Sequence, residues 1–307
     1  MLLLSGITFS HGILATEGGA GHYLPGSIAT LMDIAPDQSG WVIESMYLHY
    51  EGDASSSKKI PIAGAVTTSL NVKTDALTVG TLYSFEQPVF GATYTVGAFL
   101  PYVRVGVGAE LVTTLGTLSA HDSESGIGDL ILFPVMLAWK SGNWQYDAFL
   151  PIYAPTGDYK EGRLANPGLN YWSFDPTVGF SYSNDKTGFN AALHGGITFN
   201  TENSDTDYRS GSVFHLDGSI QQLLPLGPGF LSVGAEVFYL DQVSDDSSDS
   251  DLPGGFRGRT AGVGPVLDYI LPEGDETLVA ELRWLPELDV KNRVEGDYIW
   301  LKLVYQF

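Results

Sequence analysis

Ionisable side chains recur at alternate positions through the second half of this 307-residue sequence. Alternate residues of a β-strand share one face, so these groups would gather on one side of a sheet. There they could carry acid–base chemistry, bind a polar ligand, or neutralise one another in a buried network. The residues are Asp147, Asp175, His194, His215, Asp217, Glu236, Glu281, Arg283 and Lys302.

Hydrolytic catalysis is the most demanding of these possibilities, because a nucleophile must be hydrogen-bonded to a base. Ser212, His194 and His215 fall on adjacent predicted strands, but both histidines belong to the inward face, and no Gly-x-Ser-x-Gly elbow is present. The sequence has no cysteine, which excludes disulfides, thiolate metal sites and cysteine nucleophiles. We therefore expect no enzymatic activity, no cofactor and no metal site.

The elements that must position these groups are long amphipathic strands. In the last of them, Ile299, Leu301 and Leu303 alternate with Trp300 and Lys302, so one face is apolar and the other is mixed. Such segments run to roughly ten residues, the length that a tilted strand needs to cross a bilayer. A soluble β-sandwich also alternates, but its strands are usually about 5–6 residues long.

Composition favours the same class of protein. Lys and Arg total 15 against 36 Asp and Glu, and the net charge of −21 excludes binding to a phosphate backbone. Charged residues are 17% of the chain, below the roughly 25% of soluble domains, while aromatics reach 12%. No run of 18 apolar residues could form a membrane-spanning helix. We predict an all-β fold, a transmembrane antiparallel β-barrel of the bacterial outer membrane.

Twelve strands account best for the alternating segments, because single-chain bacterial barrels have even strand numbers. This count places one strand near 73–88 and assigns 52–71 to a first outer loop. Short turns are expected at 141–143, 184–188, 225–229 and 272–276. Long polar loops are expected at 112–127, 155–169, 201–209, 243–255 and 286–294.

The chain divides into three predicted parts. Residues 1–15 are interpreted as the remnant of a secretory signal that lacks a basic start, and 41–307 as the barrel. Residues 16–40 are predicted to fold into the lumen as a plug, since their glycines permit tight paths and Tyr23, Leu24 and Pro25 supply a stiff apolar tip. A disordered N-terminus is the alternative for the first part, and a disordered periplasmic tail for the second.

The predicted functional residues fall into two groups. The substrate path and plug are assigned to His22, Tyr23, Leu24, Pro25, Phe149, Tyr153, Tyr171, Phe238, Tyr298 and Trp300. The lumen charge network is assigned to Asp217, Glu236, Glu281, Arg283 and Lys302, with a structural role weighed above a direct role in transport.

The order of several motifs resembles a known family, the "putative MetA-pathway of phenol degradation" outer-membrane channels. The resemblance rests on EGGAGHYLPG (17–26), YAPTGDY (153–159), NPGLNYWSFDP (166–176), TDYRSGSVFHLDGSI (206–220), GVGP (262–265) and the C-terminal strand. It implies a barrel of twelve strands with the N-terminal segment in the lumen, and uptake of hydrophobic small molecules. The missing basic start departs from the family's export signal.

These observations lead to a prediction of passive uptake of small hydrophobic, including aromatic, compounds across the outer membrane of a Gram-negative bacterium. The alternatives are a general diffusion porin for small polar solutes and a structural barrel without transport. Expected partners are outer-membrane lipid, lipopolysaccharide, a hydrophobic substrate, and the barrel-assembly machinery through Phe307, with the protein as a monomer. Prolines within strands, namely Pro134, Pro151, Pro176 and Pro265, suggest a lateral gap as the exit or a simple bend of the wall.

Overall fold

The alternation of the sequence is realised as a wall with an inner and an outer face. The structure is a computed structural model that describes residues 21–30, 33–54, 60–62, 65–67, 69–113, 116–248 and 257–307. In β19 (Glu295–Gln306), Tyr298, Trp300 and Lys302 are buried, while Leu301 and Leu303 are exposed. The faces predicted for this strand are therefore confirmed.

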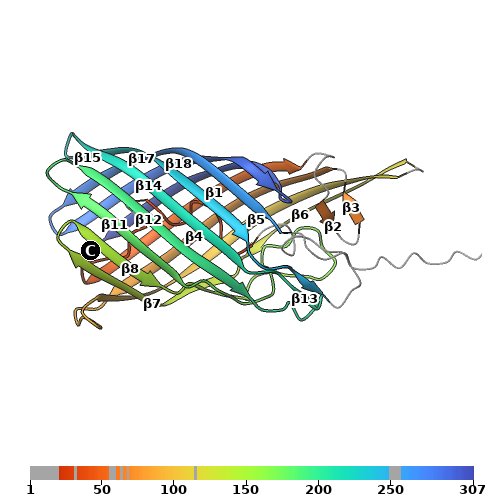
Figure 1. The fold of residues 1–307 in the computed structure, drawn as a ribbon, viewed down its shortest axis with the longest axis horizontal. Coiled ribbons are helices and arrows are strands. Elements are labelled where there is room, and N and C mark those ends of the chain that lie inside the picture. The colour runs from red at the N-terminus through yellow and green to blue at the C-terminus, as the bar shows by residue number, and fades with distance from the viewer. Residues whose placement is uncertain are drawn as a thin grey trace, which may run out of the picture.

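The described residues form a closed antiparallel barrel of twelve strands, as predicted (Figure 1). Strands adjacent in the sequence are adjacent in the barrel, and β19 pairs with β1 to close it. Three of the twelve strands are interrupted and carry two labels each. The spanning strands are β1 (Gly40–Ala54), β4 (Ser69–Ser84), β5 (Thr93–Thr113), β6 (Gly116–Ile127) with β7 (Leu130–Ser141), β8 (Trp144–Phe149) with β9 (Ile152–Ala154), β10 (Ser173–Phe174) with β11 (Thr177–Asn184), β12 (Phe189–Asn200), β14 (Val213–Leu226), β15 (Gly229–Gln242), β17 (Arg259–Glu273), β18 (Glu276–Lys291) and β19.

Short turns at one end of the barrel set this order. Gly142 has a φ of 60° between β7 and β8, and Gly274 has a φ of 66° between β17 and β18. A side chain is disfavoured in this left-handed region, so glycine allows each tight reversal. Two small ladders lie among the connections at the other end, β2 (Ile60–Ile62) with β3 (Ala65–Thr67), and β13 (Tyr208–Arg209) with β16 (Ser247–Ser248).

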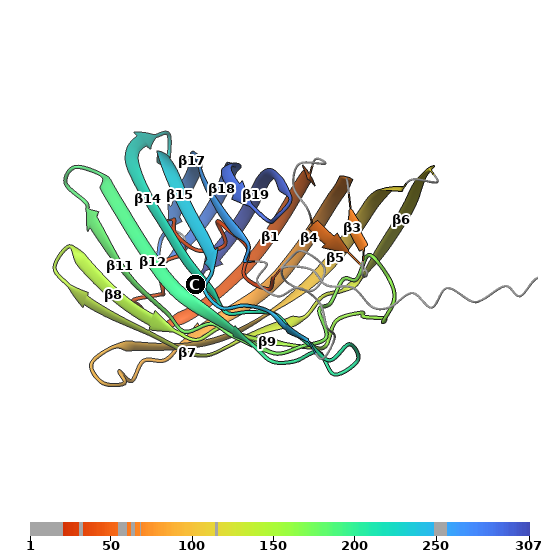
Figure 2. The ribbon, with the colours of Figure 1, turned by 45° about the vertical axis from the view of Figure 1, so that its right-hand side comes forward.

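Three loop predictions are wrong. The sequence predicts a first outer loop at 52–71, but β1 continues to Ala54 and β4 already begins at Ser69. The predicted loop 112–127 is mostly strand β6, paired with β5 as a hairpin that extends past the barrel (Figure 2). The predicted loop 286–294 is strand through Lys291. The continued parts of β1, β4 and β18 keep a buried inner face, at Ala54, Leu70 and Glu287, whereas β6 is mostly exposed and polar, which is why its sequence resembles a loop.

The outer face of the barrel is apolar. Large exposed side chains there include Leu100, Val178, Ile220, Val237 and Leu282. Exposed aromatic rings lie toward the strand ends, at Trp41, Trp144 and Phe189 near the short turns and at Trp172, Phe174 and Phe199 near the long loops. A lipid-facing apolar band between aromatic girdles is the outer-membrane arrangement. Among the described residues, no helix is long and apolar enough to cross a membrane.

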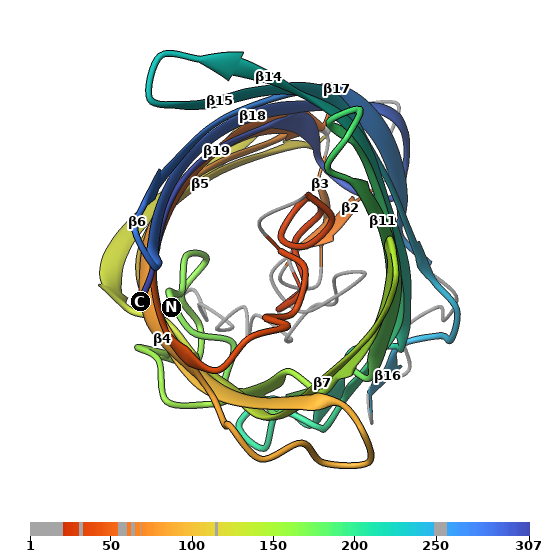
Figure 3. The ribbon, with the colours of Figure 1, turned by 90° about the vertical axis from the view of Figure 1, so that its left-hand side faces the viewer.

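The inner face has two unlike sides. The apolar wall consists of inward side chains of β1, β4, β5, β7 and β8, namely Val42, Met46, Leu48, Leu82, Phe99, Val103, Phe133, Met136 and Phe149. The polar wall consists of side chains that precede or lie on β11 to β19, namely Asp175, His194, His215, Asp217, Glu236, Asp268, Glu281, Arg283 and Lys302. Residues 21–30 and 33–39, here called the lumen segment, run inside the ring of strands (Figure 3).

Candidate functional site

Tyr23 joins the lumen segment to the polar wall at β14. Its ring stacks on His215 with centroids 3.6 Å apart, and its hydroxyl donates to Asp217. The other Asp217 oxygen accepts from the Gly26 N–H at 3.1 Å. Burial, with the Asp217 carboxylate alongside, raises the pKa of the Tyr23 hydroxyl well above its usual range. Asp217 therefore holds two points of the lumen segment at once.

The next residues of the lumen segment pack against β15, β18 and β19. Leu24 contacts a buried apolar cluster, and the indole N–H of Trp300 donates to the Pro25 carbonyl at 3.3 Å. Gly26 has a φ of 77°, and a Cβ added there would lie 2.2 Å from Leu285 Cδ1. The chain passes so close to the wall that a side chain has no room. The cluster comprises Leu48, Phe238, Leu285, Tyr298 and Trp300.

Asp33, in the lumen segment, supplies a negative charge to the two cations of the polar wall, Lys302 and Arg283. It accepts from Lys302 Nζ and lies 3.3 Å from Arg283 Nη2. It also accepts from the N–H groups of Ala29 and Thr30, at 2.9 and 3.0 Å. Burial alone would raise its pKa, but Lys302 and Arg283 outweigh that effect and hold the pKa of Asp33 well below its usual range. An ionised Asp33 thus fixes the second half of the lumen segment.

Arg283 lies at the centre of the buried charge network. Its Nη1 donates to Glu236 at 3.0 Å, and its Nε lies 2.6 Å from Glu281. Lys302 faces Glu281 in the register of β18 and β19, yet its side chain turns to Asp33 and to the Ser27 carbonyl, 3.0 Å away. The structure thus brings Glu236, Glu281 and Arg283 together, while Asp217 contacts Tyr23 and His215 instead.

His22 holds the start of the lumen segment between two rings. It stacks on Tyr153 at 4.9 Å and meets Tyr171 edge-on at 5.0 Å. Its Nε2 lies 2.9 Å from Asp129, and its Nδ1 lies 2.7 Å from Ser173 Oγ. This places serine, histidine and aspartate in a row, which would be the arrangement of an activated nucleophile.

The hydrogen bonds of Ser173 do not favour that chemistry. The Ser173 hydroxyl donates to Asn200 Oδ1 at 2.6 Å. The Asn200 amide nitrogen is itself directed at the Ser210 and Gly211 carbonyls, which fixes the orientation of the amide. Ser173 therefore accepts from His22 instead of giving it a proton. The row of residues holds the lumen segment in place.

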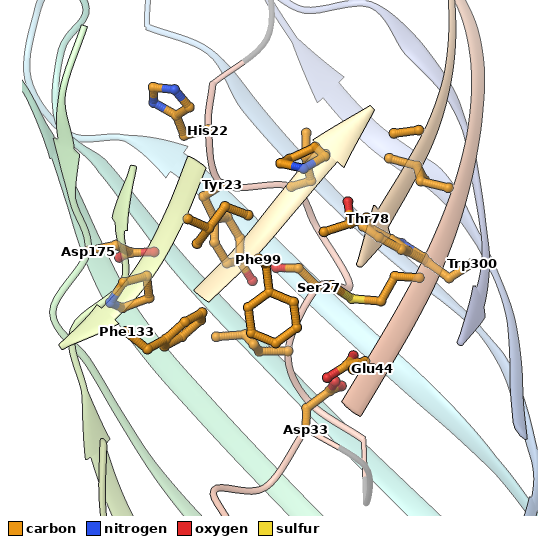
Figure 4. Close-up of a pocket in the computed structure, with 18 of the residues that line it drawn as sticks. His22, Tyr23, Ser27, Asp33, Glu44, Thr78, Phe99, Phe133, Asp175 and Trp300 are labelled. Carbon is orange, nitrogen blue, oxygen red and sulfur yellow. The ribbon is translucent and has the colours of Figure 1, made fainter. Parts of the chain in front are cut away.

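Opposite these contacts, a cavity of about 680 Å³ lies between the lumen segment and the apolar wall (Figure 4). Phe99 and Phe133 meet edge to face at 5.6 Å, and Phe133 and Phe149 are 6.3 Å apart. Ile28, Ile34 and Ala35 of the lumen segment contribute to the other side. The exposed lining is mostly apolar, although charged side chains such as Asp33, Glu44 and Asp129 also border it. A concave and mostly apolar site of this size is suited to a small hydrophobic ligand.

The residues predicted for the substrate path divide between the cavity and the packed interior. His22, Tyr23, Leu24, Phe149, Tyr153, Tyr298 and Trp300 line the cavity. Tyr171, buried beside His22, and Phe238, in the cluster under Leu24, are not among its lining residues, nor is Pro25. Sequence reasoning missed Met46, Phe99, Val103 and Phe133, which also line the cavity. The apolar side chains on both faces of β5 concealed which side points inward.

Two of the four predicted prolines lie where neighbouring strands are interrupted, whereas Pro134 lies within β7 and Pro265 lies within β17, paired with Ala235. β8 ends before Leu150 and Pro151, and β10 ends before Asp175 and Pro176. Beside them, the register between β5 and β7 shifts near Pro134. Single bonds persist here, from the Leu150 N–H to the Val135 carbonyl and from the Asp175 N–H to the Pro151 carbonyl. The ladder is thus interrupted at this level, and a second gap in pairing lies between β17 and β18, from Gly262 to Val266.

The chain resembles a known outer-membrane channel in fold and a known protein family in sequence. The fold is similar to the crystal structure of the COG4313 outer membrane channel from Pseudomonas putida F1, with a TM-score of 0.66 and 19% identity over 93% of this chain and 100% of that chain. The β domain of the Bordetella autotransporter BrkA gives a TM-score of 0.49, with 11% identity over 88% of this chain and 100% of that chain. A search of curated proteins found no match. The family described as "Putative MetA-pathway of phenol degradation" matches residues 55–303, and the chain belongs to this family.

Proposed function

We propose that the protein is an outer-membrane channel for the passive uptake of small hydrophobic compounds, aromatics included. One observation carries the proposal, the cavity of about 680 Å³ with its phenylalanine-rich apolar wall. Hydrophobic solutes cross the lipopolysaccharide leaflet poorly, and an apolar path through protein would remove that barrier. The family match and the barrel fold support this function.

The lumen segment acts in this proposal as a plug that closes the polar side of the barrel. Side chains on several strands hold it, among them Asp217 on β14, Arg283 on β18, Lys302 on β19 and Gln145 on β8, whose amide donates to the Ala35 carbonyl at 2.7 Å. A general diffusion porin would need an open aqueous constriction. A structural barrel would need no cavity at all.

We also propose an oligomeric state, a membrane environment and the absence of catalysis. The protein is a monomer in contact with outer-membrane lipid and lipopolysaccharide, and it catalyses no reaction. The Phe307 ring is about half exposed at the β1–β19 junction, beside Trp41, where the barrel-assembly machinery could contact it.

Uptake by whole cells tests the function. We expect cells that lack the protein to take up an aromatic hydrocarbon more slowly at low concentration than cells that express it. The uptake rate of cells that express the protein without residues 16–39 should differ from the rates of both other strains. Proteoliposomes serve as the control, since the intact protein should pass little ion current and little sugar. Unchanged uptake in both strains would reject the channel, and large conductance would favour the porin.

The exit route is a separate step, and we propose that it is lateral, through the interrupted level of β7, β8 and β11. Val178 and Ala148 are register partners beside Pro176 and Leu150. Cysteines at these two positions would lock the strands together when oxidised, because partner Cα atoms lie within disulfide reach. Oxidation should slow uptake and reduction should restore it. The same pair at Ile220 and Ala235, away from the interruption, should have no effect.

A further inference from the structure

Several acidic side chains line the cavity, and one of them, Glu44, lies on β1 among the side chains of the apolar wall. Glu44 lies on β1 between Val42 and Met46, and all three line the cavity. Figure 4 shows Glu44 beside Asp33, below Phe99 in that view. The Glu44 side chain keeps 12% of its surface exposed, so it is largely withdrawn from water yet remains open to the cavity.

Glu44 is poorly matched with its protein neighbours. Its carboxylate has no hydrogen-bond partner among the described residues, and the nearest cation, Lys302 Nζ, is 4.0 Å away. Lys302 already donates to Asp33 and to the Ser27 carbonyl. A withdrawn carboxylate without a donor is costly, since the hydrogen bonds it made to water are lost.

The surrounding charges leave room for one more cation. Along the connected network, the carboxyl groups of Asp33, Glu44, Glu236 and Glu281 meet the cations Arg283 and Lys302. Acidic groups therefore outnumber basic groups by four to two among these residues. A positively charged ligand group beside Glu44 would reduce the imbalance, and a carboxylate there would increase it.

The same cavity also suits an aromatic ring. Phe99, Phe133 and Phe149 follow one another across β5, β7 and β8 at centroid distances of 5.6 and 6.3 Å. Edge-to-face and offset contacts with a further ring are favourable at such spacings. The cavity thus offers aromatic surface together with the carboxylate of Glu44, which has no donor among the described residues.

We propose that this cavity is a binding site for aromatic compounds that carry one hydrogen-bond donor, with a protonated amine bound best, and that Glu44 accepts from that donor. Aromatic carboxylates are rejected. This inference rests on the proposed function and adds a specificity-determining residue to it. If Glu44 served only to balance Lys302, its substitution would change stability without changing the order of ligand affinities.

Four matched compounds separate these possibilities: 2-phenylethylamine, 2-phenylethanol, ethylbenzene and phenylacetate. Each is titrated by calorimetry into the intact barrel in lipid nanodiscs at about pH 7.5, where the amine and the acid are both ionised. Empty nanodiscs provide the correction for partition into lipid. The intact protein should bind the amine most tightly, then the alcohol, then the hydrocarbon, and should not bind phenylacetate.

Two variants locate the discrimination at Glu44. In Glu44→Gln, the amine should lose about 10- to 100-fold in affinity, the effect of a hydrogen bond to a charged group, while the alcohol changes little. In Glu44→Leu, both donors should bind no better than ethylbenzene. Glu51→Gln, an exposed acid on the same strand, is the matched control and should behave as the unmodified protein.

The outcomes distinguish a failure of the role assigned to Glu44 from a failure of the channel function. If all four compounds bind equally to the intact protein, or if Glu44→Gln weakens amine and hydrocarbon alike, the role of Glu44 is overturned while the channel stands. If ethylbenzene and the amine both fail to bind and uptake is unchanged by deletion, the channel itself is rejected. A fall in unfolding midpoint without a change in ligand order would assign Glu44 to structure alone.

Discussion

The polar wall and the apolar wall are built from the same kind of strand, but they differ in how they meet the lumen segment. The polar wall is filled, since Tyr23, Gly26 and Asp33 of the lumen segment contact it through hydrogen bonds and ion pairs. The apolar wall is left open, with Phe99 and Phe133 facing a cavity. Buried charges require partners, and hydrophobic side chains do not. The polar wall therefore fixes the lumen segment, and the apolar wall is free to receive a ligand.

The comparison is tested most strongly by removing the central cation of the polar wall. Arg283→Met leaves Asp33, Glu236 and Glu281 without their shared partner. Loss of one member of a buried ion pair costs about 3–5 kcal/mol. We expect a loss of this size in the free energy of urea unfolding in lipid vesicles.

Arg259→Met provides the control for that variant. Arg259 pairs with Asp289 near the strand ends, and both side chains are exposed. Exposed pairs contribute about 0–1 kcal/mol, so this variant should unfold almost as the unmodified protein does. Equal losses in the two variants would mean that the buried network does not fix the polar wall.

A smaller effect is expected where the lumen segment passes the wall without room for a side chain. Gly26→Ala combines an unfavourable φ with a Cβ 2.2 Å from Leu285 Cδ1. The left-handed backbone alone costs about 1–2 kcal/mol for a residue with a side chain. We expect the segment to leave the wall more often, so that a cysteine at Ser27 in the variant reacts faster with a maleimide.

Gly91→Ala is the control for Gly26→Ala, because it introduces the same kind of backbone strain without crowding against a neighbouring side chain. Gly91 has a φ of 76°, but a Cβ there would meet no atom within 4 Å. Labelling of the Ser27 cysteine should be unaffected in this variant. If Gly91→Ala accelerated labelling as much as Gly26→Ala, general destabilisation rather than close packing would explain the result.

Filling the open side should affect transport more than stability. Val103→Trp introduces a large ring into the cavity from β5. Because the ring occupies empty space, we expect uptake of an aromatic hydrocarbon to fall several-fold with a change in unfolding free energy below about 1 kcal/mol. Val263→Trp, on the lipid face of β17, is the control and should leave uptake unchanged. Strong destabilisation by Val103→Trp would show that the apolar wall is packed and not open.

How far the sequence predicts this molecule depends on the contrast between the two faces of each strand. In β19, Lys302 and Trp300 alternate with leucines, and the inward face could be predicted. In β5, Phe99 and Val103 point inward while Leu100 and Tyr102 point outward, and no contrast exists. The partner of Lys302 could not be predicted either, because Asp33 is 269 residues away and lies on no strand.

Acidification is expected to have the smallest effect, and it tests whether charge holds the lumen segment. Lys302 and Arg283 depress the pKa of Asp33, so its contribution to stability is complete above the unfolded value of about 3.9 and is lost only as the pH falls through the lower folded value. Proteolysis of the lumen segment should therefore be the same at about pH 7 and pH 5. Asp33→Asn should be cleaved faster at both values, because the neutral amide cannot balance Lys302 and Arg283. If the intact protein instead released the segment at pH 5, a group other than Asp33 would have to control its attachment to the polar wall.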